Sequence, residues 1–95
     1  MTRYISLIRF TEQGAKNIKK STARAHAFDK AAARAGVKIE GQYWTMGAYD
    51  GVLIIRADSE KKALHMLTEL AATGSVHTET LQAFLDTEFD AIVGR

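Results

Sequence analysis

The sequence predicts an α+β fold: a four-stranded antiparallel sheet with two helices on one face, followed by a short C-terminal helix. Segments with a period of two, rich in β-branched and aromatic residues, alternate with alanine-rich and leucine-rich segments of helical period. Their order is βαββαβ, the ferredoxin-like arrangement. A length of 95 residues, 46% hydrophobic and 25% charged, suits a single domain over residues 1–95.

The N-terminal part of the chain predicts one strand and one long helix. Residues 2–10 alternate in hydropathy and form the first strand. Residues 11–14 supply a break, and residues 15–35 follow the helical period. Gly36 occupies the position of the glycine that commonly ends a helix, so we expect the helix to stop there.

The middle of the chain predicts a hairpin. Residues 37–46 alternate, with Trp44 and Met46 on the opposite side from Tyr43, and residues 49–56 contain a β-branched run typical of a buried strand. Because only two residues separate these segments, we expect them to pair antiparallel.

The C-terminal part predicts a second helix, a fourth strand and a short third helix. Asp58 or Ser59 can cap a helix that ends near Gly74. Residues 76–81 alternate as a strand, and residues 83–93 have the apolar spacing of a short helix.

Composition excludes several kinds of chemistry. The chain contains no cysteine, which removes disulfides, thiolate metal sites and cysteine nucleophiles. No uncharged apolar run reaches the roughly 18 residues of a membrane span, and the first residues do not resemble a signal peptide. We therefore expect a soluble, cytoplasmic protein with no membrane partner.

The charge is distributed unevenly. Residues 1–38 carry nine basic and two acidic groups, a net charge of +7, whereas residues 39–95 carry a net charge of −5. Such a split suggests nucleic-acid contact or two opposite surfaces that meet in an oligomer. The basic residues of segment 15–35 fall on one helical side, as on a solvated face, without aromatics for base stacking. We therefore expect no nucleic-acid partner.

The predicted sheet has more apolar side chains than one helical layer can bury. Trp44, Met46 and Tyr49 add to the aliphatic residues of the first and third strands. An uncovered patch of this kind indicates an oligomer or a ligand groove. We expect a homodimer or higher homo-oligomer, joined through the sheet face that the helices leave open.

The hairpin also carries a family resemblance. Its Trp44–Thr45–Met46–Gly47–Ala48–Tyr49–Asp50 stretch has the form Trp-Thr-x-Gly-x-Tyr-Asp, and it resembles the GYD-domain family of small bacterial and archaeal proteins. Segments 4–14 and 76–84 also look like that family. The resemblance implies a ferredoxin-like fold related to dimeric α/β barrels, in a family whose biochemical role is largely undefined.

Five residues are the candidate ligand site. Trp44, Tyr49 and Asp50 should lie together at the hairpin, where Trp44 can stack a planar ligand and Asp50 can serve as a base or polar anchor. His77 and Glu79 share one side of the fourth strand and are second-rank members. The alternatives are structural: Asp50 accepting N–H groups in the turn, Trp44 filling a dimer core, and His77 and Glu79 forming an ion pair.

No cofactor or metal is expected. The three histidines have no metal-ligand spacing, and none has a context that singles it out as a haem ligand. The serines do not lie in a nucleophile elbow, and no glycine-rich phosphate loop is present.

These observations predict a small-molecule-binding or interaction module that uses the sheet face. The alternative is a cofactor-free dimeric-barrel enzyme acting on a small planar organic substrate, with His77 or Asp50 moving protons. The two hypotheses differ in whether Asp50, His77 and Trp44 line one cavity.

Overall fold

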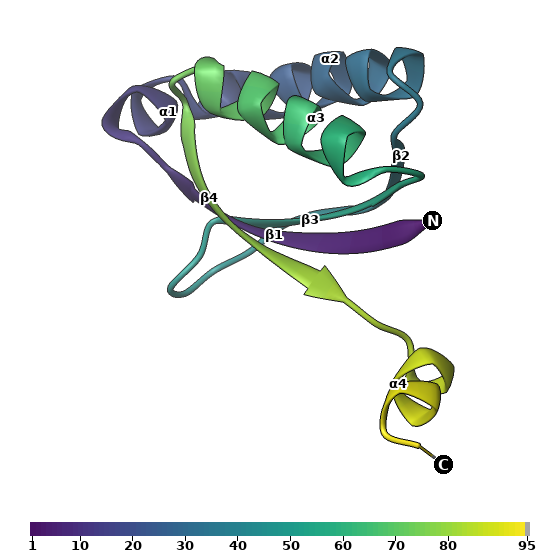
Figure 1. Ribbon diagram of the computed structural model, residues 1–95. Coiled ribbons are helices and arrows are strands. Elements are labelled where there is room, and N and C mark those ends of the chain that lie inside the picture. The colour runs from purple at the N-terminus through teal and green to yellow at the C-terminus, as the bar shows by residue number, and fades with distance from the viewer. Residues whose placement is uncertain (95) are drawn as a thin grey trace.

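The fold is a four-stranded antiparallel sheet with its main helices on one face (Figure 1). The structure is a computed structural model that describes residues 1–94. Its elements in chain order are β1 (Thr2–Phe10), α1 (Glu12–Lys16), the 3₁₀ helix η1 (Ile18–Lys20), α2 (Ser21–Arg34), β2 (Lys38–Trp44), β3 (Gly51–Ala57), α3 (Glu60–Ala72), β4 (Val76–Ala83) and α4 (Asp86–Ile92).

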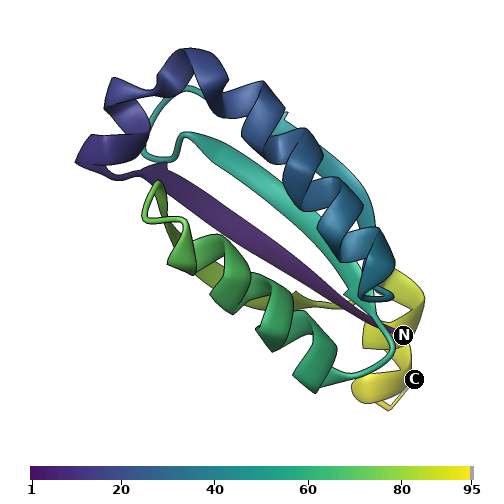
Figure 2. The ribbon, with the colours of Figure 1, turned by 90° about the horizontal axis from the view of Figure 1, so that it is seen from above.

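The strand order confirms the predicted topology. The order is β2-β3-β1-β4, so β1 and β3 are central and the other two are edge strands. Every neighbouring pair is antiparallel. Helices α2 and α3 both lie over the same face of the sheet, as the ferredoxin-like order requires (Figures 1 and 2). Among residues 1–94, no helix is long and apolar enough to cross a membrane.

The core lies between the sheet and these two helices. Residues of β3 alternate between buried and half-buried positions along the whole strand. Leu53 and Ile55 point to the helices and are at most 2% exposed, as are Val37 and Met66. The core therefore fixes which face of each central strand is covered.

The predicted single helix over residues 15–35 is wrong in its first third. Residues 11–14 are not a non-helical break, because α1 already begins at Glu12. Thr11 caps α1 by accepting a hydrogen bond from the Gly14 N–H. The helix then stops at Asn17, whose backbone leaves helical geometry and whose side chain donates to the Gln13 carbonyl. Helix η1 follows, and its residue Ile18 is 52% exposed. The continuous α-helix is therefore limited to α2.

The predicted alternation of the second strand is also wrong, because β2 contains a bulge. Its register against β3 shifts between Ile39 and Gly41. One extra residue moves every later side chain to the other face. Ile39 and Gln42 therefore both pair with β3 residues whose side chains are on the covered face. Trp44, two positions beyond Gln42, is also on the covered face and not on the open one.

The remaining boundaries differ from prediction by a few residues. The two-residue connection expected in the hairpin is a longer loop over residues 45–50. Strand β4 continues past the predicted end at residue 81, and α4 begins later than residue 83. Of the two predicted N-caps of α3, Ser59 is the one that caps the helix, by accepting from the Lys62 N–H. The predicted helix end at Gly36 is confirmed, with a φ of 80° in the left-handed region.

Candidate functional site

The structure divides the five predicted site residues between the two faces of the sheet. Trp44 and Asp50 line a groove on the covered face. His77 and Glu79 pair with Arg9 and Leu7 of β1, which alternate with the inward-facing Ile8 and therefore point to the open face. Tyr49 lies with Glu79 on that open face.

The loop over residues 45–50 is held by its own polar groups. The Thr45 hydroxyl donates to the Tyr49 carbonyl at 2.7 Å. The Asp50 N–H donates to the Ile8 carbonyl, and the Asp50 carboxylate accepts from the Phe10 N–H, both at 2.8 Å. Asp50 thus ties the start of β3 to the end of β1, and one of its carboxylate oxygens is already occupied.

At the loop end of the open face, Tyr49 reaches across β1 to β4. Its hydroxyl donates to Glu79 Oε2 at 3.1 Å, and the Arg9 guanidinium lies 4.7 Å from the centre of its ring. Arg9 Nε also donates to the Ala48 carbonyl at 3.2 Å. This cluster brings Glu79 to the hairpin within one chain and places it away from Trp44.

The middle of the open face is apolar. Six side chains from all four strands form this stripe, which we call the open-face stripe: Ile5, Leu7, Tyr43, Val52, Ile54 and Leu81. Tyr43 is 60% exposed and Leu81 is 54% exposed. An apolar centre with polar groups at both ends is the usual anatomy of a protein interface.

The other end of the open face carries an ion-pair network. Arg3 Nε lies 2.6 Å from Glu40 Oε1, and Arg56 Nη1 lies 3.4 Å from Glu40 Oε2. The hydrogen bond from Arg3 is the main cause that lowers the pKa of Glu40 below its ordinary value, and Arg56 adds to it. The β2 bulge places Glu40 between both arginines.

Helix α4 adds apolar surface on the same side of the molecule. Figure 1 shows β4 leading away from the sheet and α4 standing apart from it, on the side opposite α2 and α3. We call the segment that follows β4, residues 84–93, the α4 arm. Its large apolar side chains are about half exposed: Phe84, Leu85, Phe89, Ile92 and Val93. The open-face stripe and the α4 arm are therefore two uncovered apolar surfaces on the same side of the molecule.

On the covered face, α2 and α3 lie apart along the sheet (Figure 2), and side chains of both helices line a groove. This interhelical groove has a volume of about 680 Å³. Phe28 and Ala31 of α2 face Met66 and Leu70 of α3, and Leu53 lies in the floor. Its size and apolar lining are those of a small-molecule pocket.

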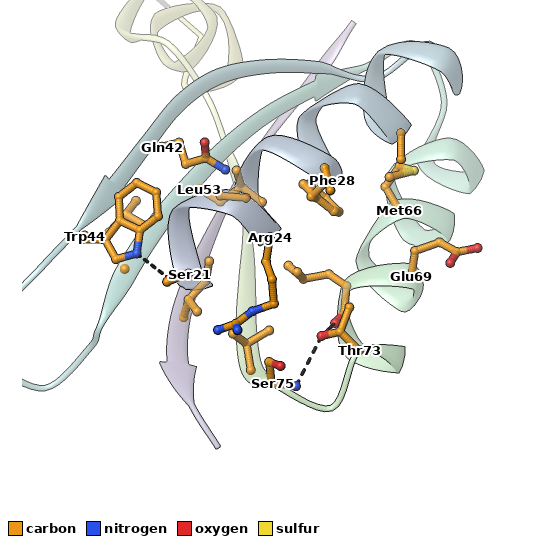
Figure 3. Close-up of a pocket in the computed structure, with 18 of the residues that line it drawn as sticks. Ser21, Arg24, Phe28, Gln42, Trp44, Leu53, Met66, Glu69, Thr73 and Ser75 are labelled. Carbon is orange, nitrogen blue, oxygen red and sulfur yellow. Dashed lines mark hydrogen bonds between the residues drawn. The ribbon is translucent and has the colours of Figure 1, made fainter. Parts of the chain in front are cut away.

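Polar groups gather at the end of the groove nearest η1 (Figure 3). Trp44 Nε1 donates to the Ser21 hydroxyl at 2.9 Å, which joins β2 to the start of α2. Arg24 Nη1 donates to the Asn17 carbonyl at 3.0 Å. The sequence pattern placed Arg24 on a solvated basic face and did not identify Ser21, because neither position differs locally from its neighbours.

The histidines do not assemble into a metal site. His65 lines the groove and lies 3.7 Å from Glu69, with both side chains about 60% exposed, while His77 is on the open face. Within residues 1–94, no cluster of three or more histidine or acidic side chains could hold a metal ion.

Comparison with known proteins identifies the family. The GYD domain model matches residues 4–93. The chain belongs to the GYD-domain family. This GYD protein is 32% identical over 84 residues to a Thermus thermophilus protein named "Glutamine synthetase and cystathionine beta-lyase binding protein", and the match covers 87% of the chain and 88% of that relative. No solved structure matches it. The predicted resemblance is thereby confirmed.

Proposed function

We propose that this GYD protein is a homo-oligomeric protein-binding module that self-associates through the open-face stripe. The observation that carries the proposal is the uncovered apolar centre of the sheet, with an ion-pair network at one end and the Tyr49 cluster at the other. Burying such a surface against a second copy is favourable by about 25 cal/mol per Å² of apolar area. The α4 arm extends the apolar area on the same side.

The relative supports the protein-binding part of the proposal. Its name describes a protein that binds glutamine synthetase and cystathionine beta-lyase. We propose the same kind of role here, with those two enzymes as the first partners to test.

The enzyme alternative lacks the arrangement it needs. It required Asp50, His77 and Trp44 around one cavity, but His77 faces the open side of the sheet. Asp50 and Trp44 line the groove, where one Asp50 oxygen accepts the Phe10 N–H. The binding role therefore has the stronger support.

Changing one exposed leucine tests self-association. Leu81 lies in the open-face stripe and is 54% exposed, so Leu81→Lys should leave the fold intact while it places a charge in the interface. We expect the wild type to sediment as a dimer or larger species at micromolar concentration and Leu81→Lys to sediment as a monomer.

Leu64→Lys is the matched control. Leu64 is 63% exposed on α3, on the other side of the molecule, and its substitution should not change the sedimentation coefficient. A wild-type protein that sediments as a 10.5 kDa monomer would refute self-association.

Binding of glutamine synthetase and cystathionine beta-lyase is tested separately by surface plasmon resonance with the purified enzymes. The wild type should bind at least one of them saturably. If neither binds, the partner assignment is wrong, whatever the oligomeric state proves to be.

A further inference from the structure

The interhelical groove plays no part in the proposed protein-binding role. We infer that it binds a monocarboxylic acid with a flexible aliphatic tail. The carboxylate is held by Arg24 and Ser21, and the tail lies between α2 and α3.

Arg24 supplies the positive charge for the head group. It is half buried in the groove lining and extends from α2 into it (Figure 3). One of its nitrogens donates to the Asn17 carbonyl, and it has no ion pair with any carboxylate in the described chain. Its other N–H groups therefore remain able to bind an anion, and a planar guanidinium matches a carboxylate particularly well.

Ser21 supplies a second donor beside it. Its oxygen accepts from Trp44 Nε1, so its own hydrogen remains for a ligand oxygen. Ser21 and Arg24 are three residues apart in α2 and therefore lie on one face of the helix. Trp44 fixes the hydroxyl through this hydrogen bond and lines the same end of the groove.

The two acidic residues of the groove interact with groups other than Arg24. Asp50 accepts from the Phe10 N–H, and Glu69 lies 3.7 Å from His65 at an exposed edge of α3. Neither forms an ion pair with Arg24. The positive charge of Arg24 is therefore not neutralised by a carboxylate of the groove.

The rest of the groove suits an aliphatic tail. The lining beyond the polar end is mainly alanine, leucine, methionine and phenylalanine side chains. Both Arg24 and Arg34 line it, and ten residues of α-helix span roughly 15 Å, so the groove is elongated. A narrow, flexible chain fills such a space, and burying it contributes about 0.8 kcal/mol per CH₂ group.

The test uses decanoate as the probe, with decanol and acetate as comparisons. Trp44 is the one tryptophan of the chain, so its fluorescence reports on the polar end of the groove. Decanoate should change this emission saturably and raise the melting temperature. Decanol, which has the tail without the charge, and acetate, which has the charge without the tail, should each bind at least tenfold more weakly.

Two arginine variants test where the carboxylate binds. Arg24→Gln should weaken decanoate binding by roughly tenfold or more, the usual loss for a charge-assisted hydrogen bond. Arg34→Gln is the matched control, since Arg34 lines the same groove at an exposed position at the C-terminal end of α2, and it should change the affinity less than twofold. Ser21→Ala provides a second, milder variant and should weaken binding by a few fold.

Specific results would overturn the inference. Absence of saturable decanoate binding excludes the site, and equal affinity for decanol excludes a carboxylate ligand. If Arg34→Gln and Arg24→Gln lose the same amount of decanoate affinity, the carboxylate is not held by Arg24. Leu81→Lys should bind decanoate like the wild type, because Leu81 lies on the open face and does not line the groove.

Discussion

At the scale of single residues, the hairpin motif is explained by contacts within the chain. Thr45 holds the loop by bonding to the Tyr49 carbonyl, and Tyr49 bonds to Glu79. Asp50 joins β3 to β1, and Trp44 joins β2 to α2. Each of these side chains therefore stabilises the fold, and Trp44 additionally shapes the end of the groove.

Replacing Asp50 tests its role in joining the two strands. Asp50→Ala leaves the partly buried Phe10 N–H without its acceptor. We expect a loss of about 1–3 kcal/mol in the free energy of unfolding, measured by urea denaturation. Asp58→Ala is the control, because its pair with Lys62 is exposed and should cost less than about 0.5 kcal/mol. Equal losses in the two variants would argue against the strand-joining role.

Glu40 makes stability depend on pH. Its folded-state pKa lies below the ordinary value of 4.5, mainly because Arg3 donates to the carboxylate. The ion pair therefore stabilises the fold above that value, and the stabilisation is lost as the pH falls through the folded-state pKa.

Glu40→Gln should show this effect directly. The variant should have a lower urea midpoint than the wild type at neutral pH, and the two midpoints should converge as the pH falls through the folded-state pKa of Glu40. Glu69→Gln, at an exposed pair on α3, should change the midpoint little at neutral pH. A difference between Glu40→Gln and wild type that persists unchanged in acid would refute the ion-pair explanation.

At the scale of elements, the short helix α1 is fixed by a close approach of two backbones. Gly14 is buried, and a Cβ atom there would lie 2.0 Å from the Ser75 carbonyl oxygen. That same oxygen accepts the Thr11 N–H at 3.0 Å. The sequence indicated only a break at residues 11–14, because the need for glycine arises from a segment some 60 residues away in the chain.

Gly14→Ala should therefore be destabilising despite the better helix propensity of alanine. We expect a loss of about 1–3 kcal/mol in the free energy of unfolding, because backbone atoms must move. Hydrogen exchange at the Thr11 amide should also accelerate. Ala15→Ser, one residue further at an exposed position, should change stability by less than about 0.5 kcal/mol. Unchanged stability of Gly14→Ala would show that α1 can shift away from Ser75 without cost.

At the scale of the whole molecule, the sheet separates two surfaces with different chemistry. On its covered face lies an apolar groove that contains a half-buried arginine. Its open face has an apolar centre between polar ends. The proposed self-association and the inferred carboxylate site can therefore be altered one at a time. The sedimentation and fluorescence experiments measure these two properties independently.

The sequence alone determined the order of the strands and the main helices, the sheet topology and the helix end at Gly36, because periodicity and capping depend on near neighbours in the chain. It did not determine which face Trp44 occupies, since the bulge at Glu40 reverses the later alternation. It also did not reveal the groove or the role of Arg24. Those features depend on how far apart α2 and α3 lie on the sheet, which only the tertiary packing decides.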